Sequence, residues 1–245
     1  MKVRADQLLV ARALAPTRAR AQALILAGKV YAGETRIDKA GSMLAEDAPI
    51  AVRGDDHPYV SRGGVKLAGA LDAFGVDPKG KRCLDLGAST GGFTDCLLQR
   101  GAASVAAVDV GYGQLAHSLR IDPRVLVLER TNAKTLEPEQ IGGACDLVVV
   151  DASFIGLGKL ASAIAKNTRP GGELVALVKP QFEVGRDEAS RTRGVVRDPE
   201  LRARAIEAAI ADVREAGFEI RGSADCVIAG PKGNLEAFVH ARRSA

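Results

Sequence analysis

Long apolar runs are missing from this sequence of 245 residues. A membrane-spanning helix needs roughly 20 consecutive apolar residues, and no stretch approaches that length. The chain opens with Met1-Lys2-Val3-Arg4 and continues into a charged segment instead of the apolar core of a secretory signal. We therefore expect a cytoplasmic protein with no membrane partner.

Cysteine is scarce and scattered. The four cysteines, Cys83, Cys96, Cys145 and Cys226, form no Cys-x-x-C pair, and no histidine stands at metal-ligand spacing from them. This spacing predicts neither a disulfide framework nor a bound metal. Repeats and low-complexity tracts are also missing, and 47% apolar and 26% charged residues are ordinary values for a globular chain. The sequence should fold into one or two domains.

Positive charge is concentrated at the start of the chain. Residues 1–44 hold eight basic and three acidic side chains, a net charge of +5, whereas the remaining residues carry −1 and the whole chain +4. The basic residues are Lys2, Arg4, Arg12, Arg18, Arg20, Lys29, Arg36 and Lys39. Such clustering is typical of a phosphate-binding surface, and a solvated face without a partner is the alternative.

The first 58 residues predict a small α+β module. We expect helices over 4–14 and from Thr17 to Gly28, and strands over 29–31, 35–37 and 50–52. The motifs Arg4-x-Asp6-x-x-Leu9, Thr17-Arg18-x-x-Ala21 and Ile25-x-x-Gly28-x-Val30 resemble the RNA-binding domain of ribosomal protein S-four. The RNA contacts that we expect here are Arg4, Arg18, Arg20 and Lys29.

The polar, turn-forming stretch 54–58 predicts the domain boundary, so the second domain covers 59–245. Strands are expected near 82–86, 104–109, 124–129, 146–150 and 173–179, after a helix from Ser61 to Phe74. Short all-apolar strands alternating with helices predict an α/β fold with a Rossmann-like, doubly wound parallel sheet. Asp198-Pro199 begins a helix to about Ala216. An antiparallel hairpin, 218–228 and 235–242, should close the sheet.

A glycine-rich turn follows the first of these strands. It does not have the G-x-G-x-x-G spacing of dinucleotide sites, and instead matches the first motif of class I S-adenosylmethionine methyltransferases. Asp109 ends the next strand, where a carboxylate can accept hydrogen bonds from both hydroxyls of a ribose. The expected cofactor is S-adenosylmethionine, bound by Asp85, Gly87, Ser89, Thr90, Gly91, Gly92, Phe93 and Asp109.

Four ionisable residues should converge at the same sheet edge. Asp151 and Lys179 end two strands, Glu236 lies two residues into the returning strand of the hairpin, and Lys66 comes from the helix before the sheet. A ribose hydroxyl becomes a good nucleophile only when a base removes its proton. A partly desolvated lysine beside a second cation can act as that base, with carboxylates to orient it.

These residues coincide with the Lys-Asp-Lys-Glu tetrad of FtsJ-type ribose methyltransferases, and the whole chain closely resembles the TlyA family, also called hemolysin A. The runs Val108–Leu115, Glu129–Ala133, Asp151-x-Ser153-Phe154-Ile155 and Val178–Glu183 carry the resemblance. It implies 2′-O-methylation of cytidine in ribosomal RNA, favouring 23S over 16S, with Lys179 as base, Lys66 and Asp151 as partners, and Glu236 as orienter. It also implies Asp151 and Asn132 near the methyl donor, Asn132 standing where other FtsJ-type enzymes have an acid.

The segment from Phe182 to Arg197 is long for a connection between a strand and a helix, and we predict a mobile lid that orders on RNA. Its RNA contacts would be Arg186, Arg191 and Arg193, joined by Arg62 before the sheet. A loop without a role is the alternative.

Three other functions compete with this interpretation. A base-directed RNA methyltransferase would need an Asn-Pro-Pro-Tyr type motif or a catalytic cysteine near Asp151, and the sequence has neither there. A membrane-lytic hemolysin would need an amphipathic or spanning segment. A non-catalytic RNA-binding factor would not be expected to keep the tetrad intact.

Overall fold

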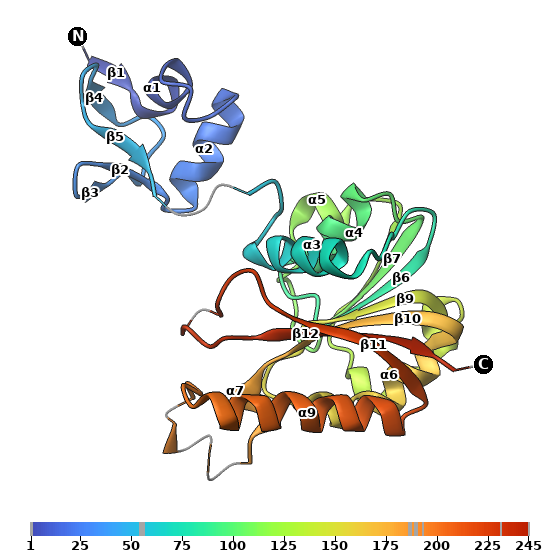
Figure 1. Cartoon of the computed structure of the whole chain (residues 1–245). Coiled ribbons are helices and arrows are strands. Elements are labelled where there is room, and N and C mark those ends of the chain that lie inside the picture. Colours follow the sequence, from blue (N-terminus) through green and yellow to red (C-terminus); the bar gives the residue numbers. More distant parts are fainter. Residues whose placement is uncertain are drawn as a thin grey trace. The chain divides into compact units, whose positions relative to one another are not determined.

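The chain divides into two compact units, Met1–Asp56 and His57–Ala245 (Figure 1). The computed structural model describes residues 2–53, 57–185, 188, 191–192, 194–230 and 232–244. The division lies close to the polar stretch 54–58 that the sequence analysis identified as the boundary. Each unit has its own buried apolar core, as expected of a domain.

The smaller unit packs two helices against short strands. Helices α1 (Ala5–Ala11) and α2 (Arg18–Leu26) contact each other, and Thr17 caps α2 by accepting a hydrogen bond from the amide of Arg20. Strands β2 (Val30–Ala32), β3 (Thr35–Arg36) and β5 (Ile50–Val52) form one sheet, and β1 (Lys2–Arg4) pairs with β4 (Met43–Ala45) in another. The expected helix over 4–14 was too long, and β1 and β4 were not predicted.

Buried Asp6 organises the basic residues of this unit. Its carboxylate is fully buried and accepts hydrogen bonds from Arg4, Arg18 and Gln22. The Arg4 hydrogen bond, with those of Gln22 and Arg18, holds the pKa of that carboxyl well below its usual value. The side chains of Arg4 and Arg18 remain 39% and 53% exposed, so both are still partly open to solvent. Their predicted RNA contacts remain predictions.

The larger unit is built on a seven-stranded sheet with the order β11-β12-β10-β9-β6-β7-β8. Strands β6 (Arg82–Leu86), β7 (Ser104–Val108), β8 (Val125–Leu128), β9 (Cys145–Val150) and β10 (Thr168–Val178) are mutually parallel. Strands β11 (Phe218–Asp225) and β12 (Ala237–Arg243) form the antiparallel hairpin, with β12 inserted between β10 and β11. The predicted doubly wound sheet is confirmed.

Helices cover both faces of this sheet (Figure 1). Helices α3 (Arg62–Phe74), α4 (Gly92–Gln99) and α5 (His117–Arg120) lie on one face, and α6 (Ala161–Asn167) and α9 (Pro199–Glu215) on the other. Short helical turns occupy the connections: η1 (Ala133–Thr135), η2 (Pro138–Ile141), η3 (Leu157–Lys159) and α7 (Pro180–Glu183). One apolar core therefore lies on each face of the sheet.

Several helix ends agree with the sequence signals. Asp198 caps α9 by accepting from the amides of Glu200 and Leu201, and Gly75 ends α3 with φ +66°. Ser61 does occupy the N-cap of α3, but its side chain makes no capping hydrogen bond in the structure. Glu236 directly precedes β12 and does not lie within it, which corrects the expected strand start.

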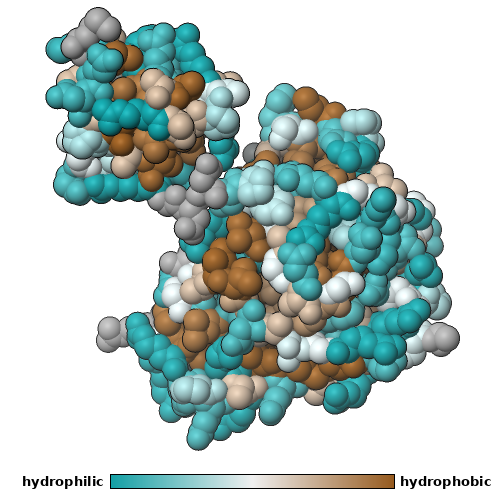
Figure 2. Space-filling view, turned by 45° about the horizontal axis from the view of Figure 1, so that its top comes forward, coloured by the Kyte–Doolittle hydropathy of each residue, from teal (hydrophilic) through white to brown (hydrophobic). Residues whose placement is uncertain are grey.

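Hydrophilic side chains cover most of the visible face of each unit, and hydrophobic ones gather in smaller patches (Figure 2). Within the part of the chain that the structure describes, no helix combines the length and apolarity needed to cross a membrane.

Candidate active site

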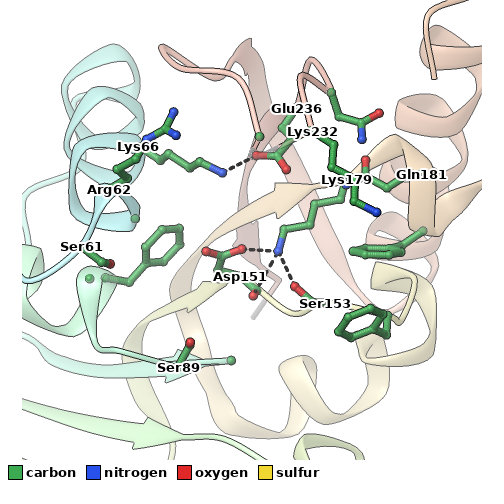
Figure 3. Close-up of a pocket in the computed structure, with 18 of the residues that line it drawn as sticks. Ser61, Arg62, Lys66, Ser89, Asp151, Ser153, Lys179, Gln181, Lys232 and Glu236 are labelled. Carbon is green, nitrogen blue, oxygen red and sulfur yellow. Dashed lines mark hydrogen bonds and ion pairs between the residues drawn. The ribbon is translucent and has the colours of Figure 1, made fainter. Parts of the chain in front are cut away.

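A cavity of about 810 Å³ opens beyond the carboxyl ends of β6, β9 and β10. Open α/β sheets bind ligands at this edge. Its walls come from the glycine-rich turn, the start of α3, the loop after β9, α7 and the loop before β12 (Figure 3). The polar side chains that line it are Ser61, Arg62, Lys66, Ser89, Thr90, Asp151, Ser153, Lys179, Gln181, Lys232, Asn234 and Glu236. The predicted tetrad thus lines one cavity.

The glycine-rich turn between β6 and α4 leaves no room for side chains at two of its glycines. A Cβ on Gly87 would lie 2.8 Å from the backbone oxygen of Asp151, and Gly87 has φ +89°. A Cβ on Gly92 would lie 2.2 Å from Oγ of Ser61. These glycines therefore let the turn pack closely against Asp151 and Ser61, and both glycines line the cavity at the N-terminus of α4, where free amide groups suit a bound ligand. Gly91 is packed against Leu115 and Leu119 and does not line the cavity.

Asp85, in β6, connects the strand before the glycine-rich turn to the helix after it. It is fully buried, its Oδ2 accepts from both the amide and the hydroxyl of Thr94, and it does not line the cavity. Its Oδ1 is buried without a hydrogen-bond partner among the described residues. Burial raises the pKa of Asp85 to about 7, although the Thr94 hydrogen bonds oppose this shift. Asp85 is thus placed to hold the turn, while its predicted contact with the cofactor is not visible in this geometry.

Asp109 joins the same turn to the end of β7. Its Oδ2 accepts from the amide of Ser89 at 2.8 Å, and its Oδ1 accepts from the amide of Gly111 at 2.7 Å. A carboxylate has about four acceptor positions, so each oxygen can accept another hydrogen bond. Asp109 is half-buried at the sheet edge and is not among the residues that line the cavity, so its predicted ribose contact stays a prediction.

Lys179 stands at the centre of the polar side chains. Its Nζ donates to Oγ of Ser153 at 2.9 Å and to the backbone oxygen of Asp151 at 3.4 Å. The same Nζ lies 2.6 Å from Oδ1 of Asp151 as an ion pair, although Oδ1 accepts no aligned hydrogen bond from the described residues. Only 10% of the Lys179 side chain is exposed, so water competes little for this ammonium group.

Lys66 and Glu236 form a second pair across the cavity (Figure 3). Nζ of Lys66 donates to Oε2 of Glu236 at 2.5 Å, and their side chains are only 9% and 1% exposed. Burying two charges is costly unless each partner neutralises the other. The pair therefore fixes α3 against the loop that precedes β12 at the cavity.

Two phenylalanines and one asparagine complete the walls. Phe154 has φ +66°, is 90% exposed and lies with its ring centroid 5.4 Å from that of Phe182. Buried Asn234 accepts from the amide of Val196 and donates to the backbone oxygen of Gly194. The end of the predicted lid is thus attached to the loop before β12.

Of the other predicted site residues, Arg62 lies at the cavity and the rest do not line it or are not described. Asn132 is exposed, caps η1 through the amide of Lys134 and does not line the cavity. Arg191 pairs with Glu188, and Arg62 lines the cavity while donating to the backbone oxygen of Ala229. Arg20 and Lys29 are half-buried in the smaller unit. Arg186 and Arg193, with residues 187, 189 and 190 of the predicted lid, lie outside the described residues.

Sequence reasoning missed seven polar or aromatic cavity residues: Ser153, Phe154, Gln181, Phe182, Ser61, Lys232 and Asn234. The first four lie in runs that carry the family resemblance, Asp151–Ile155 and Val178–Glu183, so the signal was present. Lys232 and Asn234 lie in the turn of the predicted hairpin. This run was interpreted only as a turn, so the sequence did not indicate that the two residues line the cavity.

Residues 59–243 match the FtsJ-like methyltransferase family. The chain is 49% identical to the 16S/23S rRNA (cytidine-2′-O)-methyltransferase TlyA of Mycobacterium tuberculosis, over 98% of this chain and 90% of the relative. It is 38% identical to Hemolysin A of Brachyspira hyodysenteriae, over 97% and 99% of the two chains. A solved structure named "Putative hemolysin from Streptococcus thermophilus" superposes with a TM-score of 0.77 at 38% identity, covering 99% of this chain and 89% of that one.

The match spans the whole larger unit, and the relatives extend it over nearly the entire chain. Together with the cavity at the predicted sheet edge, this shows that the chain belongs to the TlyA family of FtsJ-like methyltransferases.

Proposed function

We propose that the protein transfers a methyl group from S-adenosylmethionine to the ribose 2′-hydroxyl of a cytidine in ribosomal RNA. The position of Lys179 is the main support for this proposal. Its Nζ contacts Asp151 and Ser153 within a cavity that the Lys66–Glu236 pair also lines. The 16S/23S specificity in the name of the Mycobacterium tuberculosis relative supports the substrate class.

The residues present fit the methyl donor. Gly87 and Gly92 line the cavity beside the free amide groups at the N-terminus of α4, and Asp109 has acceptor positions left for a ribose. When bound, S-adenosylmethionine supplies an electrophilic methyl group on a sulfonium centre. Ser89 and Thr90 line the cavity from the turn and would contact the donor there.

The chain's own residues would activate the acceptor. Lys179 is placed to accept the proton that the ribose 2′-hydroxyl would lose on methylation. Asp151 then stabilises the resulting ammonium group at 2.6 Å. The Lys66–Glu236 pair lies across the same cavity and orients the ribose. Holding acceptor and base in line is the main contribution that such a site makes to rate.

The smaller unit and the arginines near the cavity would bind the RNA. Arg4 and Arg18 keep exposed side-chain surface, and Arg20 and Lys29 belong to the same basic unit. Arg62 is exposed at the cavity wall. An enzyme with a ribosomal substrate would act in the cytoplasm, where ribosomes are assembled.

The test is methyl transfer from radiolabelled S-adenosylmethionine to purified 30S subunits, 50S subunits and protein-free ribosomal RNA. We expect label on the ribose of one cytidine or a few, detected as a nucleotide resistant to alkaline cleavage. Label on a base would favour the base-directed alternative, and no label on any RNA would contradict the proposal. Incubation with red cells in parallel tests the activity that the name Hemolysin A implies for the relative.

A further inference from the structure

Two connecting segments meet beside Lys179. One is the loop after β9, residues 151–157, and the other is 179–183, which includes α7. They touch through four side-chain contacts: Lys179 with Asp151, Lys179 with Ser153, Phe182 with Phe154, and Glu183 with Leu157. The position of the Lys179 ammonium group therefore depends on how firmly the 151–157 loop is held.

Glu183 makes the contact farthest from the cavity. Its Oε1 accepts from the amide of Leu157 at 2.8 Å, and that amide belongs to the first residue of η3, where helical N–H groups have no partner within the helix. Its Oε2 lies against Gly156, because a Cβ on that glycine would be 2.8 Å from it. One carboxylate thus fills the space at the loop's end and satisfies its free amide.

Glu183 is partly buried, so water has limited access to replace its hydrogen bond with the Leu157 amide. The carboxylate is half-buried, and this burial, with a smaller contribution from Asp212 of α9, raises its pKa to about 7. Lys179 lies with Glu183 around a small apolar pocket formed by the loop and β9. A side chain without an oxygen here would leave the Leu157 amide poorly satisfied.

The loop is strained and needs such an anchor. Phe154 has φ +66°, which a non-glycine residue rarely adopts, and its ring is 90% exposed. A residue in this region keeps its conformation only when neighbouring contacts enforce it. Lys179 and Phe182 contact the loop at Ser153 and Phe154. Glu183 contacts it at its far end, through the amide of Leu157.

We infer that Glu183 is a positioning residue: by binding the Leu157 amide it fixes the 151–157 loop and so aligns Ser153, Asp151 and the Nζ of Lys179 for the proton transfer. This inference rests on the proposed function, because Lys179 is the base there. Glu183 does not line the cavity, so it would act on the reaction only through the loop.

The test compares Glu183→Ala, Glu183→Gln and the parent. We expect the alanine variant to lose about tenfold to hundredfold in kcat, since small misplacements of reacting groups have effects of that size, with the Kd for S-adenosylmethionine changed less than about twofold. Glutamine keeps an acceptor oxygen for the Leu157 amide, so it should retain kcat within about threefold. Calorimetry gives the Kd, and single-turnover methylation of ribosomal subunits gives the rate.

A second pair of variants covers the case in which Glu183→Ala does not fold. Gly156→Ala keeps the carboxylate but places a methyl group against it, and should reproduce the loss in kcat. Gly222→Ala in β11 is the matched control, because a Cβ there makes only an ordinary contact, 3.7 Å from the ring of Phe74, and the residue does not line the cavity. It should behave like the parent.

The outcomes distinguish a failure of the proposed function from a failure of the positioning role of Glu183. A parent protein that does not methylate ribosomal RNA contradicts the proposed function. If the parent methylates and folded Glu183→Ala or Gly156→Ala turns over as fast, the positioning role is wrong. It is also wrong if Glu183→Gln loses as much as alanine, because the hydrogen bond would then not be what matters.

Discussion

The buried ion pair between Lys66 and Glu236 should show strong energetic coupling. The two charged atoms are 2.5 Å apart, and the side chains are 9% and 1% exposed. Removing one partner leaves an uncompensated buried charge, which destabilises a protein by about 3–5 kcal/mol. Lys66→Met and Glu236→Leu should therefore each lower the free energy of unfolding by about that amount.

The double variant should be close to the parent in stability. Replacing a buried ion pair by apolar residues of similar volume is often neutral, because the desolvation cost of both charges disappears with their attraction. The two single losses would then exceed the double loss by several kcal/mol, a coupling well above the roughly 0.5 kcal/mol error of such cycles. All three variants should lose methyl transfer, because both residues line the cavity.

The assay is urea unfolding followed by far-ultraviolet circular dichroism, since the chain has no tryptophan to report by fluorescence. The exposed pair Lys166–Glu137, 2.6 Å apart but with side chains 51% and 49% exposed, is the matched control. Its cycle should give less than about 1 kcal/mol. Single losses at Lys66 and Glu236 below about 1 kcal/mol, or a double loss equal to their sum, would refute the reasoning.

Three further predictions concern the turn and the base. Lys179→Ala should abolish methyl transfer while thermal unfolding and S-adenosylmethionine binding stay near those of the parent; near-normal turnover would exclude its role as base. Asp109→Ala should weaken the Kd for S-adenosylmethionine roughly tenfold to hundredfold, about 1.5–3 kcal/mol, by calorimetry, and an unchanged Kd would refute the ribose contact. Asp85→Asn should remove a pH dependence of stability. Because the folded pKa of Asp85 is raised from 3.8 to about 7, the folded state holds the extra proton between these values, and stability falls as pH rises through that window. The unfolding free energy of the variant minus that of the parent should thus increase from about pH 4 to about pH 7, by at most about 4 kcal/mol, and a flat difference would contradict the buried ionisation.

The sequence by itself determined most of the larger unit's architecture. All-apolar runs such as Leu147–Val150 have no polar face, so they fit only strands buried on both sides, and the structure has them there. Asp198-Pro199 and Gly75 act through local backbone chemistry, so they marked helix ends correctly. Because parallel strands end at one edge, the meeting of Asp151 with Lys179 also followed from strand ends alone.

Tertiary structure decided what depends on contacts between distant segments. Lys66 and Glu236 are 170 positions apart, so their hydrogen bond, and its near-complete burial, follow from the packing of α3 against the loop before β12. The same is true of Asp85, which the glycine motif suggested as a cofactor contact but which packing turned inward to Thr94. Short strands such as β1 and β4 also escaped prediction, because each is three residues long and is stabilised only by pairing with the other. Local propensity and periodicity are properties of neighbouring residues, whereas burial, pKa and ion pairing depend on which surfaces the folded chain brings together, and a single sequence does not state these directly.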